Sequence, residues 1–207
     1  MTLAQALIAY LVAASLLTIT PGLDTAMVLR TAAVEGPKRA AMAAVGIGAG
    51  CLAWGVAVAL GLGVLLSASS AAYTLIKWAG AAYLLWLGAN LIAKPRSKFD
   101  LTAGGKAARG GNWFARGLTT NLLNPKVGVF YVSFLPQFVP AGAAPAPFIV
   151  LLAAIHVALS LAWFALLIGA TTPLKAWLQR GPIVRWLDRL TGAVFVGFGL
   201  KLALARR

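Results

Sequence analysis

The chain has few of the side chains that bind metals or carry redox chemistry. It contains four acidic residues, one histidine and one cysteine, which is too few for a convincing metal cluster. The single cysteine, Cys51, can form neither a disulfide nor a dithiol pair within one chain. A phosphate-binding loop of the Gly-x4-Gly-Lys-Ser/Thr type is absent, and the spacing of Gly46, Gly48 and Gly50 does not fit the dinucleotide fingerprint. These absences predict a protein that is not an enzyme and holds no cofactor.

Charged side chains are missing from three long stretches, residues 1–23, 40–76 and 127–174. Hydrophobic residues make up 61% of the chain and charged residues only 11%, so the charges are confined to the segments between these stretches. A bilayer crossing takes about 20 apolar residues, so each charge-free stretch contains at least one crossing. The composition therefore predicts an all-α integral membrane protein within the lipid bilayer.

Basic residues outnumber acidic residues by 18 to 4, and they flank the apolar segments. Counted by connection between those segments, Lys and Arg number three, none, six, none and three. This alternation is typical of the positive-inside rule, which places the first, third and fifth connections in the cytoplasm. Membrane orientation accounts for the positive charge, and we do not expect nucleic acid as a partner.

Six apolar segments are predicted to be transmembrane helices, at about residues 3–34, 40–66, 72–93, 114–139, 148–170 and 186–205. Proline interrupts the first and the fourth, so we expect broken helices at Pro21 and Pro125. Residues 1–207 then form a single membrane domain. It consists of a first repeat over 1–93, a basic cytoplasmic loop over 94–113 and a second repeat over 114–207. If the first segment does not cross fully, the N-terminus lies on the cytoplasmic side.

The two halves follow the same order: a broken segment, a long uncharged helix, and a helix that opens with basic residues and tryptophan. Three crossings is an odd number, so two such units insert in opposite orientation, as in the inverted repeats of many secondary transporters. Residues 77–81 (Lys-Trp-Ala-Gly-Ala) are similar to residues 189–193 (Arg-Leu-Thr-Gly-Ala). We therefore predict about six helices arranged as two inverted three-helix repeats.

Helix-breaking and polar residues gather at the two interruptions. Backbone groups freed at membrane depth are tolerated only against protein or water, and an ionisable residue there marks a functional site. The alternative is a loop at the membrane surface with an ordinary helix cap. The candidate substrate-binding or coupling residues are Thr20, Asp24, Asn121, Asn124 and Lys126, and the helix-breaking residues are Pro21, Gly22 and Pro125.

A carboxylate from one half and an ammonium group from the other suit a zwitterionic ligand. Asp24 could receive an ammonium group, while Lys126, Asn121 and Asn124 receive a carboxylate. Without a ligand the two charges are expected to pair with each other, and Asp24 is a candidate for coupling to protons. The alternatives are a capping or first-turn role for Asp24 and, for Lys126, a flexible stem that reaches the membrane surface.

Three further features have structural interpretations. His156, in the middle of an uncharged helix, is predicted to be neutral and bonded to a neighbouring helix, with proton shuttling as the alternative. Asp188 and Arg189 are adjacent, which favours a local surface pair over a proton relay. Gly46 and Gly50 have the small-xxx-small spacing of packed membrane helices, which we expect to be used within the monomer, with a homodimer contact as the alternative.

Several motifs are distributed over the whole chain. In the first half they are residues 20–24 (Thr-Pro-Gly-Leu-Asp), 46–50 (Gly-Ile-Gly-Ala-Gly) and 77–84 (Lys-Trp-Ala-Gly-Ala-Ala-Tyr-Leu), and in the second half 121–126 (Asn-Leu-Leu-Asn-Pro-Lys), 134–138 (Phe-Leu-Pro-Gln-Phe) and 190–193 (Leu-Thr-Gly-Ala). Through these motifs the sequence resembles the lysine exporter (LysE/RhtB) family of bacterial amino-acid efflux proteins. The family usually has a second proline in the first motif, where this chain has Leu23.

The resemblance implies a small inner-membrane exporter of amino acids such as lysine, arginine, threonine, homoserine or leucine, driven by the proton motive force. Asp24, Asn124, Pro125 and Lys126 match the family's candidate transport positions. Two other functions stay open: an ion or metal exporter would need more ligating side chains, and a membrane oxidoreductase would need a partner for Cys51. We therefore expect a multi-pass protein of the bacterial inner membrane that exports an amino acid or close derivative, with protons as the coupling ion.

Overall fold

The structure is a computed structural model that describes residues 2–68, 70–95, 111–169 and 180–204. Within these ranges the chain is helical and contains no β-strand. In chain order the elements are α1 (Leu3–Ile19), α2 (Leu23–Val34), α3 (Pro37–Ala68), α4 (Ser70–Ala93), α5 (Trp113–Leu122), α6 (Pro125–Val129), the π-helical turn η2 (Phe130–Phe134), the 3-10 turn η3 (Leu135–Phe138), α7 (Pro145–Gly169) and α9 (Gly181–Leu204). Most of the basic loop predicted over 94–113 lies outside the described residues.

Two of the described helices are long and apolar enough to cross a membrane: α3, over Pro37–Gly61, and α7, over Pro145–Gly169. The α1 and α2 helices make a third span if the pair, bent by 50°, crosses as one unit. In α4 the stretch Trp78–Ala93 is apolar but shorter, and α9 carries charges at Arg185, Asp188, Arg189 and Lys201. The all-helical membrane architecture is confirmed, while six full crossings stay a prediction.

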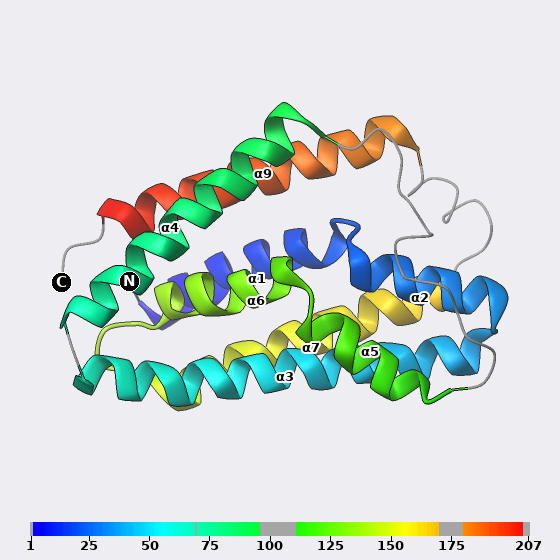
Figure 1. The fold of residues 1–207 in the computed structure, drawn as a ribbon, viewed down its shortest axis with the longest axis horizontal. Coiled ribbons are helices and arrows are strands. Elements are labelled where there is room, and N and C mark those ends of the chain that lie inside the picture. The colour runs from blue at the N-terminus through cyan, green and yellow to red at the C-terminus, as the bar shows by residue number, and fades with distance from the viewer. Residues whose placement is uncertain (1, 69, 96–110, 170–179, 205–207) are drawn as a thin grey trace.

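The helices form three groups (Figure 1). Helix α4 packs along α9 on one side, and α3 packs against α5 and α7 on the other. Between the two groups lie α1 and α6, which are central in the view of Figure 1. The long uncharged helices of the two predicted repeats, α3 and α7, thus contact each other. The last helices of the two predicted repeats, α4 and α9, also contact each other.

Glycines allow close helix contacts where the predictions placed them. A Cβ at Gly46 would meet the carbonyl oxygen of Phe114 at 2.0 Å, and one at Gly50 would meet the side chain of Asn121 at 2.6 Å. The expectation that this spacing serves packing within the monomer is confirmed, because α3 approaches α5 at both positions. Gly88 and Gly192 face each other in the same way between α4 and α9.

An aromatic core joins the central elements to their neighbours. Phe130, Phe134 and Phe138 follow one another along η2 and η3, and Tyr10 of α1 packs edge-on against Phe138 at 5.3 Å between ring centroids. The Tyr10 hydroxyl donates to the carbonyl oxygen of Leu152 at 2.7 Å, which ties α1 to α7. Because the buried Tyr10 hydroxyl has a hydrogen-bond partner, the ring packs in the core without the cost of an unsatisfied polar group.

Both predicted helix breaks are present, and local chemistry explains them. Helix α1 ends at Ile19 and α2 begins at Leu23, so the break covers residues 20–22. Helix α5 ends at Leu122 and α6 begins at Pro125, so the second break is residues 123–124. Proline at the first position of a helix needs no backbone donor, which is why α6 starts at Pro125. Further on, Pro136 falls where the π-helical turn gives way to a 3-10 turn.

The ends of the helices separate into two sets (Figure 1). Helix α2 ends, and α3, α5 and α9 begin, at the right of the figure, whereas α1 begins and α3 ends at the left. The α1–α2 pair therefore runs from one end of the bundle to the other. The tight turn between α2 and α3 uses Gly36, whose φ of 90° favours glycine, and Arg39 pairs with Glu35 beside it.

Candidate functional site

The two breaks meet at the centre of the bundle through three side-chain contacts. The Asn121 amide nitrogen, at the end of α5, donates to Asp24 Oδ2 at 2.8 Å. The Lys126 ammonium group, in the first turn of α6, donates to the carbonyl oxygens of Leu17 at 3.2 Å and Thr20 at 3.0 Å. These hydrogen bonds join Thr20, Asp24, Asn121 and Lys126, and Asn124, the fifth predicted binding residue, lies beside Asp24 as well.

The carbonyls that Lys126 contacts belong to the last turn of α1. The final carbonyls of a helix lack intrahelical partners and carry the negative end of the helix dipole, so they attract a cation. Gly22 leaves space for the lysine stem: a Cβ at this position would lie 3.6 Å from Lys126 Nζ. We call the two carbonyls, Leu17 O and Thr20 O, the carbonyl cradle.

The two charges predicted to face each other attract each other electrostatically, and each also has hydrogen-bond partners of its own. Asp24 lies in the first turn of α2, after an N-cap, Gly22, that makes no side-chain cap hydrogen bond. A carboxylate at that position interacts favourably with the helix dipole. The interpretation of Asp24 as a first-turn residue is therefore confirmed. Lys126 reaches inward to the carbonyl cradle rather than outward, so its interpretation as a stem reaching the membrane surface is wrong.

Two acceptor atoms at the centre of the site are unsatisfied. In the part of the chain that the structure describes, Asp24 Oδ1 and Asn121 Oδ1 are buried and have no hydrogen-bond partner. Leaving a buried polar atom unsatisfied costs about 1–3 kcal/mol, so such atoms call for an explanation. Both are acceptors, and a ligand that donates hydrogen bonds would satisfy them.

Thr20 links the first break to α9. Its hydroxyl donates to the carbonyl oxygen of Leu16 at 2.6 Å and shares a short hydrogen bond with the hydroxyl of Thr191. Because the Thr20 proton is directed at Leu16, Thr191 is the donor in the second bond. Thr20 therefore accepts from α9 through its side chain and from α6 through its backbone carbonyl.

A cavity of about 40 Å³ lies against these residues. A water molecule needs roughly 10–15 Å³ of such space, so the cavity holds a few waters and is too small for an amino acid. In this conformation the site is closed around its own side chains. The polar residues that line the cavity are Thr18, Thr20, Asp24, Thr25, Asn124, Lys126, His156 and Ser160.

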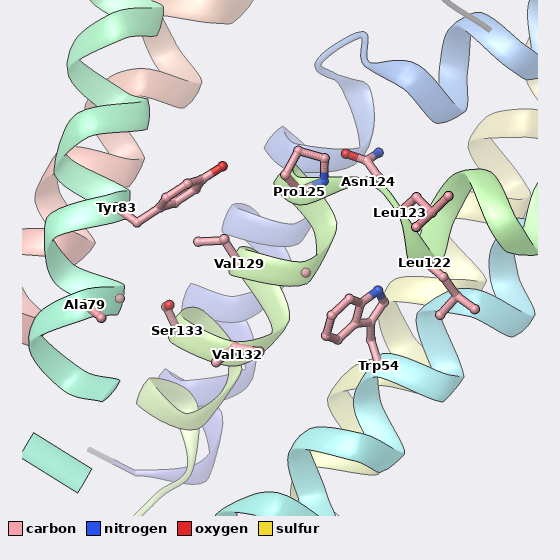
Figure 2. Close-up of a pocket in the computed structure, with 12 residues that line it drawn as sticks. Trp54, Ala79, Tyr83, Leu122, Leu123, Asn124, Pro125, Val129, Val132 and Ser133 are labelled. Atoms are coloured by element: carbon pink, nitrogen blue, oxygen red, sulfur yellow. The ribbon is translucent and has the colours of Figure 1, made fainter. Parts of the chain in front are cut away.

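The second break is capped by its own side chain and borders a larger groove. The Asn124 side chain accepts from the backbone amide of Lys126 at 3.1 Å, as a helix N-cap. On the other side of Asn124 is an open, mostly apolar groove of about 470 Å³. Figure 2 shows Tyr83 extending from α4 toward Pro125, with Trp54 rising from α3 beyond α6. Asn124 lines both spaces, so it separates the closed cavity from the groove.

Other predicted residues have different outcomes. His156 is buried and its Nδ1 lies 2.9 Å from the Tyr131 hydroxyl, which confirms a bond to a neighbouring element. Asp188 is fully buried, so its prediction as a surface residue is wrong. Asp188, Thr191 and Phe195 are all buried at spacings of three and four, so they share the inward face of α9. That spacing was the signal in the sequence that would have identified Thr191 and Asp188.

Helices long enough to cross a bilayer, together with two helix breaks that place ionisable side chains at the centre of an apolar bundle, define a helical membrane protein with an internal polar site. The chain belongs to the LysE type translocator family, whose family model matches residues 15–206. The resemblance stated from the motifs is thereby confirmed.

Relatives match over nearly their full length. The threonine efflux protein of Salmonella typhi is 32% identical, with 90% of this chain and 92% of that protein covered. The leucine efflux protein of Klebsiella pneumoniae is 30% identical, over 94% and 92%. The uncharacterized membrane protein YrhP of Bacillus subtilis is 32% identical, over 97% and 100%. No solved structure matches the chain.

Proposed function

We propose that this protein is a secondary transporter that exports amino acids or close derivatives across the bacterial inner membrane. Its family and the names of relatives, which are efflux proteins for threonine, leucine and homoserine or homoserine lactone, support this proposal. Those three amino acids differ in their side chains and share an α-ammonium and an α-carboxylate group. A site that serves such a range must recognise the shared zwitterion first.

The observation that carries the proposal is the pair of unsatisfied buried acceptors at the meeting point of the breaks. Asp24 Oδ1 and Asn121 Oδ1 can each accept a hydrogen bond, and an α-ammonium group has three protons to donate. The carboxylate of Asp24 adds charge complementarity, which strengthens such hydrogen bonds. The ammonium end of the substrate therefore belongs beside Asp24.

The carboxylate end has two candidate partners nearby. The first-turn amides of α2 follow Gly22, which supplies no capping side chain, so they remain available to an anion at the positive end of the helix. The Lys126 ammonium group lies beside Gly22 and carries a positive charge. Substrate orientation then follows from the site, with the ammonium toward Asp24 and the carboxylate toward Gly22 and Lys126.

We further propose that Asp24 couples export to protons by holding either a proton or the substrate ammonium group. The inverted repeat and six crossings belong to the same proposal, supported by the contacts of α3 with α7 and of α4 with α9. By the positive-inside rule, the bundle end where α2 ends and α3 begins, next to Lys38 and Arg39, faces the cytoplasm.

The proposal is tested by efflux from cells that hydrolyse dipeptides containing threonine, leucine, homoserine or lysine. Cells with the protein should release one or more of these amino acids faster than cells with an empty vector, and an uncoupler should remove the difference. Membrane abundance is matched by immunoblot. No difference from the vector for any of the four amino acids would contradict amino-acid export.

A further inference from the structure

The Lys126 ammonium group has the same chemistry as the α-ammonium group of an amino acid. Both are compact cations with three N–H donors. In the structure Lys126 uses two of its donors on the carbonyl cradle, at 3.0 Å from Thr20 O and 3.2 Å from Leu17 O. Asp24 and both cradle residues line the same closed cavity as Lys126.

We propose that Lys126 is an internal competitor for the substrate's ammonium group. In the conformation seen here its side chain occupies the carbonyl cradle, and an amino acid enters the site only when Lys126 leaves. The displaced ammonium group then binds the substrate's carboxylate. This inference rests on the proposed function and specifies which part of the substrate replaces which part of the protein.

The geometry around the lysine stem allows the exchange. The stem crosses Gly22, where a Cβ would lie 3.8 Å from Lys126 Cδ, so residue 22 places no side chain against the stem. The backbone of Lys126 is fixed by the Asn124 cap, so only the flexible part of the residue needs to move. With Lys126 in the cradle, the remaining 40 Å³ admits only small molecules such as water.

The exchange gives the site a preference for amino acids over amines, which charge complementarity with Asp24 alone does not give. A primary amine without a carboxylate must displace Lys126 and leaves two ammonium groups beside the single charge of Asp24. An amino acid displaces Lys126 and supplies the carboxylate that receives it. The site therefore selects zwitterions and rejects amines, although both carry the ammonium group that fits Asp24 and the cradle.

The test measures binding to the full-length protein in lipid nanodiscs by isothermal titration calorimetry. The ligands are threonine and leucine and their decarboxylated analogues, 1-aminopropan-2-ol and 3-methylbutylamine. If Lys126 fills the site about nine-tenths of the time, only about one-tenth of the protein can bind an amine. Removing Lys126 then raises the apparent affinity for the amine about tenfold. We expect Lys126→Met to raise amine affinity by this factor and to lower affinity for the amino acid that the wild type binds.

Controls separate the exchange from a structural role and from failure of the proposed function. Lys94→Met, which removes an exposed lysine just after α4, should leave amine affinity unchanged. If Lys126→Met does not yield folded protein, Lys126→Gln serves, since a neutral amide competes less and should change amine affinity in the same direction. Equal losses of amine and amino-acid affinity would overturn the exchange. Wild-type protein that binds neither amino acid would count against export, while the amine result would still decide whether Lys126 is a competitor.

Discussion

The two helix breaks each interrupt an apolar segment, but they differ in how their backbone groups are capped. The first, at residues 20–22, leaves α2 without a capping side chain, because its N-cap is Gly22. The second, at residues 123–124, is closed by its own cap, because Asn124 accepts from the Lys126 amide. The first break also receives side chains from elsewhere, Lys126 on its carbonyls and Thr191 on its hydroxyl.

This difference shows how two helix breaks can form a site that distinguishes the two ends of its ligand. A site built from two identical breaks would hold a symmetric ligand, whereas a zwitterion needs one end of each charge. In the site that we propose, the region of the first break supplies the carboxylate and the open backbone groups, and the region of the second supplies the ammonium and amide side chains. Substitutions at one break or the other therefore test which break holds which end of the ligand.

The largest effect is expected from Asp24→Asn, which removes the only charge of the first break. Losing an interaction with a desolvated charge costs about 2 kcal/mol or more, so amino-acid affinity and export should fall roughly 30-fold or further. Glu35→Gln is the control, since Glu35 pairs with Arg39 at the bundle end. If Asp24→Asn exports at the wild-type rate, Asp24 has no role in transport and only stabilises the first turn of α2 through the helix dipole.

Asn121→Ala should have the next largest effect, because it removes one of the hydrogen bonds between the regions of the two breaks. Asp24 Oδ2 loses its amide donor, and a hydrogen bond to a charged group contributes about 1.5–3 kcal/mol, so affinity should fall by about tenfold or more. The measurement is equilibrium binding in nanodiscs. Asn90→Ala is the matched control, because Asn90 donates only within α4, to the Trp86 carbonyl, and should bind as the wild type does.

Thr191→Val tests the link between the first break and α9. Valine keeps the volume and removes the hydroxyl that donates to Thr20, which should lower the free energy of unfolding by about 1 kcal/mol. Thr31→Val is the comparison, because the Thr31 hydroxyl bonds only its own helix at the Met27 carbonyl. Thermal unfolding in the same detergent should show a larger loss for Thr191→Val. Equal losses would mean that the contact between α1 and α9 adds no stability.

The smallest effect is expected from Gly22→Asn, which gives the first break the cap that the second already has. The backbone at Gly22 has a φ of −146°, so asparagine fits without strain, and an asparagine cap should stabilise α2 by a few tenths of a kcal/mol. The new cap would occupy first-turn amides of α2. Unfolding temperature should therefore rise slightly while amino-acid affinity falls, and a rise in both would argue against a carboxylate site there.

The breaks could be predicted from the sequence because proline, glycine and asparagine act locally. Pro21 with Gly22, and Asn124 with Pro125, favour the end of one helix and the start of the next through local effects, and both breaks lie where predicted. The predicted helix ends differ from the observed ones by a few residues, as at α3, which begins at Pro37 rather than at about residue 40. The number of membrane crossings is harder to predict, because it depends on α4 and α9, which are not long charge-free segments.

The contacts within the site could not be predicted, because they depend on backbone atoms and on helix faces. Lys126 donates to the backbone carbonyls of Leu17 and Thr20. Every residue has a backbone carbonyl, so the residue types do not identify these acceptors. Asp188 was mistaken for a surface residue because its neighbour Arg189 suggested a local pair. Its burial follows from the face of α9 that packs inward, which is set by the approach of α9 to α4 at Gly192.

One measurement tests the central claim most directly: the coupling between Asp24 and the ammonium group of the ligand. Binding of leucine and of its 2-hydroxy acid analogue, 2-hydroxy-4-methylpentanoate, is measured in nanodiscs with wild type and with Asp24→Asn, or with threonine and its 2-hydroxy analogue if leucine does not bind. The account predicts that wild type strongly prefers the amino acid and that Asp24→Asn removes most of this preference. A substitution that weakens both ligands by the same factor would contradict it, because Asp24 would then contact some other part of the substrate or none.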